Sequence, residues 1–344
     1  MTCPVPGVVE SRGTRVAVRR AWPTTRGGLR FEGADDAGRV RAGTITLGAV
    51  PKVRLLGHGE DPKLPDLPAA MAGGELVVHR YGKRAVVRKS EEYVKVVRAG
   101  DASALAESAE AGRRRALQAG LLAPEVLEAA SGRLSTSPVP GAAFHSAART
   151  ATAQQWETWW GQWADRWPHF VVADDSGLAS FSAADEVAVI NAAVGRALAW
   201  SALPDRTGRG RRWTAEVCRA LGRVRTPQLG VVHRDLHDKQ LLAGPHGIGV
   251  LDFDTVCLAE PALDLANLLV HAQWRAIQGV WSREQAIVAC SAISRVRRAL
   301  AVPEDRCVAY AHGTSLRLAA LYAFRPRWSA VAISWWEQQM RELS

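Results

Sequence analysis

Oxygen-bearing side chains are concentrated in residues 231–269 of this chain. Asp235 follows an apolar step, Gln240 comes five residues later, and Asp252 follows a second apolar run. Carboxylate and amide oxygens are ligands that Mg²⁺ accepts while it shares the rest of its shell with phosphates. A carboxylate beside such a site can also accept a hydroxyl proton. The residue types therefore indicate metal-assisted phosphoryl transfer.

The residues between the amide and the second carboxylate predict how these groups meet. Apolar runs at 240–243 and 248–251 flank the turn Gly-Pro-His-Gly at 244–247. This pattern predicts a β-hairpin with a four-residue loop. Residues at the open end of an antiparallel hairpin face each other, so Gln240 and Asp252 are expected side by side.

The order and spacing of these groups match the phosphoryl-transfer layout of kinase-type folds. The loop reads His-Arg-Asp-Leu-His at 233–237, and Ala-Leu-Asp-Leu-Ala follows at 262–266. These motifs resemble the aminoglycoside phosphotransferase and choline kinase family, in which the loop usually reads His-Gly-Asp-Leu-His-x-x-Asn. Here Arg234 replaces Gly and Gln240 replaces Asn. The longer Gln side chain either ligates metal through the same type of oxygen or weakens the site. In the second case the chain would be a low-activity or inactive member of the family.

The resemblance covers about residues 75–325 and implies an α+β, bilobal protein-kinase-like fold. We expect a small β-rich N-lobe at 71–140 and a mainly helical C-lobe at 141–344, with the catalytic loop at 231–254. Residues 1–70 are predicted to form an extra N-terminal β-rich cap.

The cap prediction depends on short alternating segments among Gly, Pro and charged residues. Strands are predicted at 15–18, 29–32 and 43–47, and prolines between 62 and 68 mark a loop. The alternative is a disordered leader with residual strands.

The resemblance also implies roles for individual residues. Asp235 would be the catalytic base that takes the hydroxyl proton. Asp252 and Gln240 would hold Mg²⁺. Lys95, on a strand predicted at 93–98, would position the α- and β-phosphates of ATP.

In the family, a Glu on the next helix holds the strand Lys. The composition of residues 102–118 predicts that helix, and we prefer Glu110 over Glu107 as the partner of Lys95. A solvent-facing role for Lys95 is the alternative. No clear Gly-rich phosphate loop precedes it, which is a departure from the kinase pattern.

Other residues near the motif have structural or open roles. His233 is expected to bond to backbone and Asp264 to brace the catalytic loop. Asp254 is a candidate second metal ligand, and Arg234 would either neutralise Asp254 or bind an acid group of the substrate. His237 is a candidate for the acceptor pocket. Three C-terminal arginines could meet an anionic substrate, although solvated surface charge explains them equally simply: Arg317, Arg325 and Arg327.

Tryptophans recur at helical spacing in residues 152–167, which predicts an amphipathic helix that Pro168 ends. Their common face either packs against the lobe core, which we favour, or forms an aromatic wall for a sugar or a cationic head group.

Composition excludes several classes of protein. The chain has 344 residues, 47% hydrophobic content and no apolar run of 18 residues, so we expect no membrane span. Its N-terminus has no signal-type apolar core. Five scattered cysteines predict reduced thiols in the cytoplasm. A net charge of +10 without a long basic block does not favour a nucleic-acid partner, and it also fits poorly with a polycationic antibiotic as substrate.

The function that these observations favour is an ATP-dependent phosphotransferase acting on a hydroxyl of a small molecule. From the resemblance, the acceptor would be a sugar, an amino sugar or an aminoglycoside-like compound, and we favour the first two. The alternative is a non-catalytic nucleotide-binding or interaction protein on the same fold. The acceptor, ATP against GTP, and the oligomeric state stay open.

Overall fold

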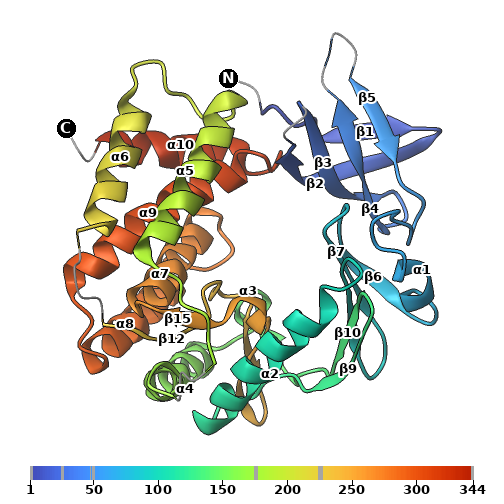
Figure 1. Cartoon of the computed structure of the whole chain (residues 1–344). Helices are drawn as coiled ribbons and strands as arrows, with labels where there is room; N and C mark the ends of the chain where they lie inside the picture. The colour runs from blue at the N-terminus through green and yellow to red at the C-terminus, as the bar shows by residue number, and fades with distance from the viewer. Residues whose placement is uncertain are drawn as a thin grey trace.

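The structure is a computed structural model with three parts: an N-terminal cap, a small β-rich lobe and a large helical lobe (Figure 1). The part of the chain that it describes comprises residues 3–24, 27–46, 48, 51–173, 177–223 and 228–341.

The cap is an antiparallel sheet whose strands follow one another in chain order. In β2, Val16, Val18 and Ala21 are buried on one face while the residues between them are mostly exposed, as the alternating pattern predicts. The described part of the first 70 residues is therefore a folded β-rich unit and not a disordered leader, although Leu47 of the third predicted strand lies outside the described residues. The strands are β1 (Val8–Ser11), β2 (Thr14–Pro23), β3 (Gly28–Asp35), β4 (Val40–Thr46) and β5 (Lys52–Leu55).

The small lobe is a second antiparallel sheet, in the order β6-β7-β8-β10-β9. Its core holds Leu76, Val87, Val94 and Val96, each at most 3% exposed. Helix α2 begins and ends at the residues that composition predicted. The elements are α1 (Leu67–Ala70), β6 (Glu75–Arg80), β7 (Arg84–Arg88), β8 (Tyr93–Val96), α2 (Ala102–Gln118), β9 (Val126–Ala130) and β10 (Arg133–Thr136).

The large lobe is mainly helical, with two small sheets that carry the catalytic motifs. Its elements are β11 (Ala142–Ala143), α3 (Phe144–Ala147), α4 (Ala153–Val171), α5 (Ala183–Ala199), α6 (Arg209–Leu221), β12 (Gly230–Val232), β13 (Leu241–Gly244), β14 (Gly247–Val250), the 3₁₀ turn η1 (Phe253–Thr255), β15 (Cys257–Ala259), α7 (Ala262–Ile277), α8 (Arg283–Ala299), α9 (Glu304–Tyr322) and α10 (Ser329–Arg341).

Two local predictions were wrong. Gly244 pairs with Gly247, so the hairpin turns over two residues instead of four. Helix α4 continues through Pro168 to Val171. A proline inside a helix costs about 3 kcal/mol, but the extra turn buries Phe170 and Val171, at 0% and 3% exposure. Burying two such side chains stabilises by about 3–6 kcal/mol, which offsets the cost.

The tryptophans of α4 pack into the core of the large lobe. Trp156, Trp160, Trp163 and Trp167 are each at most 1% exposed. Trp156 meets Trp281, from the connection between α7 and α8, edge-on with ring centroids 5.0 Å apart. These four rings are covered by protein, so the packing interpretation holds and the aromatic wall does not.

The cap contacts both lobes. Ala21 of β2 donates a backbone hydrogen bond to the carbonyl of Phe324 after α9, at 3.0 Å. Glu32 of β3 accepts one from the amide of His79 in β6, at 2.8 Å. Figure 1 shows the blue cap reaching the red C-terminal segment on one side and the cyan strands of the small lobe on the other. The cap therefore joins the two lobes independently of the chain connection between them.

Asp61, in the segment between the cap and the small lobe, anchors the β6–β7 turn. Its carboxylate accepts hydrogen bonds from His79 Nε2 at 3.1 Å, Gly82 N at 2.6 Å and Lys63 N at 2.9 Å. Burial opposes its ionisation, but these bonds outweigh burial and lower the pKa of Asp61 below 3.8.

We expect Asp61→Ala to lower the free energy of unfolding by about 2–4 kcal/mol, because it leaves buried donors without an acceptor. Urea unfolding measures this loss. Asp36→Ala is the matched control, since the Asp36 side chain is 75% exposed, and it should change stability by less than about 0.5 kcal/mol.

The effect of Asp61→Ala should also depend on pH. Because folding lowers the pKa of Asp61, its stabilisation is present above about pH 4 and is lost as the pH falls through the folded value. The difference between wild type and variant should therefore shrink below about pH 4. A difference that stays constant down to pH 2.5 would contradict this assignment.

Candidate active site

A buried carboxylate binds the backbone of residues 233–240, the part of the catalytic loop that carries Asp235. Asp264 accepts hydrogen bonds from the backbone amides of His233 and Arg234, at 2.6 and 2.8 Å. The His233 ring bonds to the carbonyl of Leu251 at 2.7 Å. The structure thus confirms the structural roles predicted for Asp264 and His233. Burial raises the pKa of Asp264 to about 6, although both amides act in the opposite direction.

Arg234 stands where the resembled family usually has Gly, and its backbone explains that preference. Its φ of 71° lies in the left-handed region, which costs about 1–2 kcal/mol for a residue with a Cβ. Its guanidinium packs over the ring of Phe181, 4.0 Å from the centroid. Asp254 is bonded elsewhere, so the predicted Arg234–Asp254 contact is not made.

Sequence reasoning missed a second set of contacts to the loop. Asp238, with 0% exposure, accepts two hydrogen bonds from Arg275, at 2.8 and 2.9 Å, and one from His145 at 2.7 Å. Asn267 donates to the carbonyl of Leu236 at 2.7 Å. A usable signal was present, because Asp264, Asn267, His271 and Arg275 form a polar stripe at helical spacing on a buried helix.

Asp235 projects from this braced loop into solvent. Its side chain is exposed and makes no hydrogen bond or ion pair within the described part of the chain. Hydrogen bonds with Asp264 and Asn267 hold the backbone on both sides of it, so Asp235 is a carboxylate presented by a rigid backbone with its oxygens available.

Lys95 of β8 bridges the two carboxylates that follow β14. Its Nζ lies 2.7 Å from Asp252 Oδ1 and 2.6 Å from Asp254 Oδ1. Burial disfavours the charge on Lys95, but both carboxylates together raise its pKa. Burial also opposes ionisation of Asp252, yet Lys95 and Arg84 hold the pKa of Asp252 well below its usual range. Burial and the nearby Asp252 raise the pKa of Asp254 despite Lys95.

Gln240 lies beside Asp252, as the hairpin predicted. Its side-chain Nε2 is 3.4 Å from Asp252 Oδ2. The backbone amide of Leu251 donates to the backbone carbonyl of Gln240 at 2.9 Å. Rotating the side-chain amide of Gln240 by half a turn would bring its oxygen next to the Asp252 carboxylate. Asp252, Asp254 and Gln240 can therefore supply oxygen ligands, and the Lys95 ammonium already shows that a cation fits between the carboxylates.

The structure does not bring Glu110 to Lys95. Glu110 lies on the outer face of α2, half exposed, and pairs with Arg113 at 3.1 Å. The face of α2 that meets the site carries Gly112 instead, where Phe253 packs directly against the helix backbone. Spacing along the helix identified the correct element but not its inward face.

Comparison with known proteins shows the family of this chain. A model of the phosphotransferase enzyme family matches residues 84–300, which is more than half of the chain. The chain belongs to this family. It is a small-molecule kinase of the phosphotransferase type, as the sequence predicted. No curated protein matches the sequence.

Solved structures share the fold of this phosphotransferase at low sequence identity. Aminoglycoside phosphotransferase APH(3'')-Id from Streptomyces rimosus is 22% identical, with a TM-score of 0.55, and the match covers 74% of this chain and 96% of that one. An aminoglycoside-3'-phosphotransferase of type VIII is 23% identical over 76% of this chain and all of its own, with a TM-score of 0.54. Amicoumacin kinase hAmiN, solved with AMP-PNP, Ca²⁺ and Ami, is 14% identical over 83% of this chain and 94% of its own, with a TM-score of 0.59.

In this phosphotransferase, the turn between β6 and β7, which would cover nucleotide phosphates, carries cationic side chains. Strands β6 and β7 precede the Lys95 strand and meet at Tyr81-Gly82-Lys83, flanked by Arg80 and Arg84. The amide of Gly82 is bonded to Asp61, so it is not available to a phosphate. Side-chain cations stand here in place of a Gly-rich loop.

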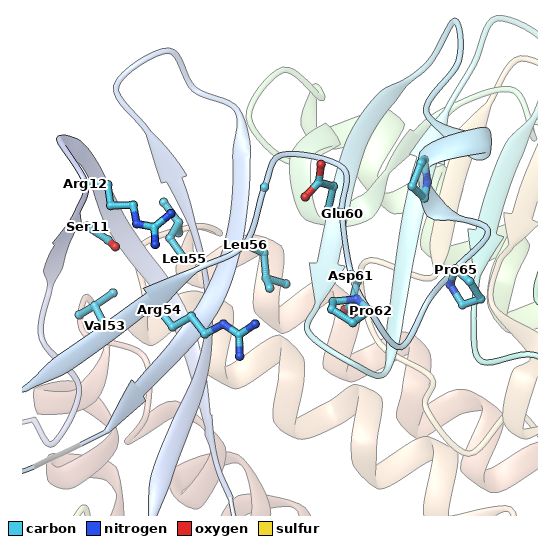
Figure 2. Close-up of a pocket in the computed structure, with 12 residues that line it drawn as sticks. Ser11, Arg12, Val53, Arg54, Leu55, Leu56, Glu60, Asp61, Pro62 and Pro65 are labelled. Carbon is cyan, nitrogen blue, oxygen red and sulfur yellow. The ribbon is translucent and has the colours of Figure 1, made fainter.

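A cavity of about 560 Å³ lies apart from this site, on the cap (Figure 2). Arg12, Arg54 and Glu60 line it together with prolines of the 62–68 segment. None of the predicted site residues reaches it. Along the described chain, no helix is long and apolar enough to cross a membrane.

The packing of Phe253 against Gly112 predicts a mutational effect on the segment that carries Asp252 and Asp254. A Cβ at position 112 would overlap the side chain of Phe253, which lies between Asp252 and Asp254. We expect Gly112→Ala to destabilise by about 1–3 kcal/mol and to weaken nucleotide binding, measured by calorimetry.

Gly195→Ala is the matched control, since a Cβ at this position of α5 meets nothing within 4 Å. It should stabilise by about 0.5–1 kcal/mol and leave nucleotide affinity unchanged. Equal behaviour of the two variants would refute the role of the Gly112–Phe253 contact.

Proposed function

We propose that this phosphotransferase transfers the γ-phosphate of ATP to a hydroxyl group of a small molecule, with Asp235 as catalytic base. The observation that carries the proposal is an unengaged Asp235 on a braced loop. In sequence it lies close to Gln240 and Asp252, and Asp252 pairs with Lys95. Family membership, the exposure of Asp235 and the ionised state of Asp252 support it.

The reaction moves one phosphoryl group and one proton. The acceptor hydroxyl oxygen forms a bond to the γ-phosphorus while the bond from that phosphorus to the bridging oxygen of ADP breaks. The hydroxyl proton passes to a carboxylate oxygen of Asp235, which already accepts its hydrogen bond in the bound state. The rigid loop supplies orientation, since Asp264 and Asp238 fix its backbone from two sides.

Lys95 and Arg84 are the residues that we assign to the phosphates. Lys95 lies between the two carboxylates, and Arg84 Nη1 is 3.9 Å from Asp254 Oδ2. A triphosphate brought to this cluster competes with the carboxylates for both cations. The cations then neutralise charge that is spread over the phosphoryl oxygens.

Asp252 and Gln240 are the residues that would hold Mg²⁺, with Asp254 as a further oxygen donor. Mg²⁺ binds carboxylate and carbonyl oxygens and would neutralise negative charge on the phosphates. The ionised state of Asp252, which Lys95 and Arg84 favour against burial, prepares this ligand at neutral pH.

Sugars, amino sugars and aminoglycoside-like compounds are the acceptor classes that the family suggests. The structure of Streptomyces rimosus APH(3'')-Id with ADP and streptomycin supports a nucleotide and a small hydroxyl compound as the two substrates of this fold.

Asp235→Asn should reduce kcat by about 10²–10⁴-fold, because the amide cannot take the proton. ATP affinity and Tm should change little, since the side chain is exposed and makes no bond within the described structure. Coupled ADP release across an acceptor panel measures turnover, with Asp36→Asn as the matched control. Full activity of Asp235→Asn would exclude Asp235 as the base.

The Gln240 assignment predicts a graded effect on metal dependence. Gln240→Ala should raise the Mg²⁺ concentration needed for half-maximal activity by about 10-fold or more, because one oxygen ligand is lost. Gln240→Asn keeps a carbonyl oxygen and should retain most of the affinity. If both variants titrate with Mg²⁺ like wild type, Gln240 is not a ligand.

A further inference from the structure

A second cavity, of about 440 Å³, opens beside the catalytic loop and differs in character from the one on the cap. Lys239 of the loop lines it, as do Arg149 after α3 and Arg325 and Arg327 after α9. We call it the cationic cavity, because no Asp or Glu is among the residues that line it.

Four cations of this cavity, Arg149, Lys239, Arg325 and Arg327, make no ion pair with an acidic side chain in the described structure. Arg275, which also reaches the cavity, is already bonded twice to the buried Asp238. Arg325 stacks on Tyr322, 3.8 Å from the ring centroid, and its buried Nε has no hydrogen-bond partner. Arg327 stacks on Trp328. The protein thus gathers positive charge here without neutralising it.

Several cationic side chains line the cationic cavity together, so their charges repel one another. Their effect is seen at Tyr322, which also lines the cavity. Burial raises the pKa of most phenols, but Arg325, Arg275 and Lys239 outweigh it at Tyr322 and lower its pKa. An anionic group placed here would relieve this repulsion.

One arginine of the cap lies next to the cationic cavity. Arg20 is near enough to Arg325 for their repulsion to count, although Arg20 is itself paired with Glu32 at 2.9 Å.

The cationic cavity is close enough to the catalytic base to hold part of an acceptor. Lys239 follows Asp235 by four residues and precedes Gln240 directly. Even a fully extended chain would separate the Cα atoms of Asp235 and Lys239 by no more than about 14 Å. That span suits a compound of one or two sugar rings with one end at each residue.

We propose that the acceptor is an anionic hydroxyl compound whose phosphate or carboxylate group binds in the cationic cavity, on Lys239 and Arg325. The inference rests on the proposed function and narrows its acceptor class. It separates this phosphotransferase from relatives whose names describe kinases of aminoglycosides, which are polycations.

Anion binding tests the cavity without knowledge of the acceptor. Calorimetry with inorganic phosphate, on full-length protein saturated with Mg²⁺ and AMP-PNP, should show saturable binding. Lys239→Gln and Arg325→Gln should each weaken it by about 10- to 100-fold, as expected for loss of a charge-assisted hydrogen bond. Arg219→Gln is the control, because Arg219 is an exposed arginine on α6. Absent binding, or equal binding by all four proteins, overturns the proposal.

Turnover of matched acceptors separates this inference from the proposed function. Glucose, glucuronate, glucose 6-phosphate and glucosamine present one ring with neutral, anionic or cationic groups. The anionic members should be preferred, and Lys239→Gln should raise their KM about 10- to 100-fold while leaving the KM for ATP unchanged. Preference for glucose or glucosamine, with no effect of Lys239→Gln, overturns the anionic acceptor but keeps the kinase. If no acceptor supports Asp235-dependent ADP release and AMP-PNP does not bind, the proposed function itself fails.

Discussion

The buried carboxylate of Asp264 is the interaction on which the active site depends. It accepts the amides of His233 and Arg234 and thereby holds two consecutive peptide units in an otherwise unfavourable turn. Hydrogen bonds to a charged acceptor contribute about 1.5–3 kcal/mol each, which exceeds the cost of the left-handed backbone at Arg234. Without this anchor the loop would relax, and Asp235 would lose its fixed direction.

The sequence correctly predicted the contacts that are made by residues close together along the chain. Asp235, Gln240 and Asp252 are placed by one short loop and one hairpin, so their spacing was enough to predict that Gln240 and Asp252 would meet. The number of residues in the hairpin turn did not affect this result, because the open end of the hairpin is set by the pairing of β13 with β14. The cap, the small lobe and the helical lobe were also predictable, since their alternating and helical patterns are clear.

The sequence did not predict the contacts that depend on which face of a helix or strand packs inward. Helix α2 was predicted at its observed residues, but the pairing of Lys95 with Asp252 and Asp254 arises from packing between the lobes, across 157 and 159 residues of chain. Pro168 was expected to end α4 because local cost was weighed without the burial of Phe170. The cationic cavity draws its residues from four separate segments, and no single window of sequence contains it.

The double attachment of the cap has a kinetic consequence. In a two-lobed enzyme, substrates enter and products leave through hinge motion between the lobes, and such steps often limit turnover. Here the Ala21–Phe324 bond comes from β2, and the Glu32–His79 bond comes from β3, the adjacent strand of the same sheet. Opening the hinge requires one of these attachments to break or the cap to deform. We expect this restraint to limit the opening of the lobes and thereby to slow the release of products.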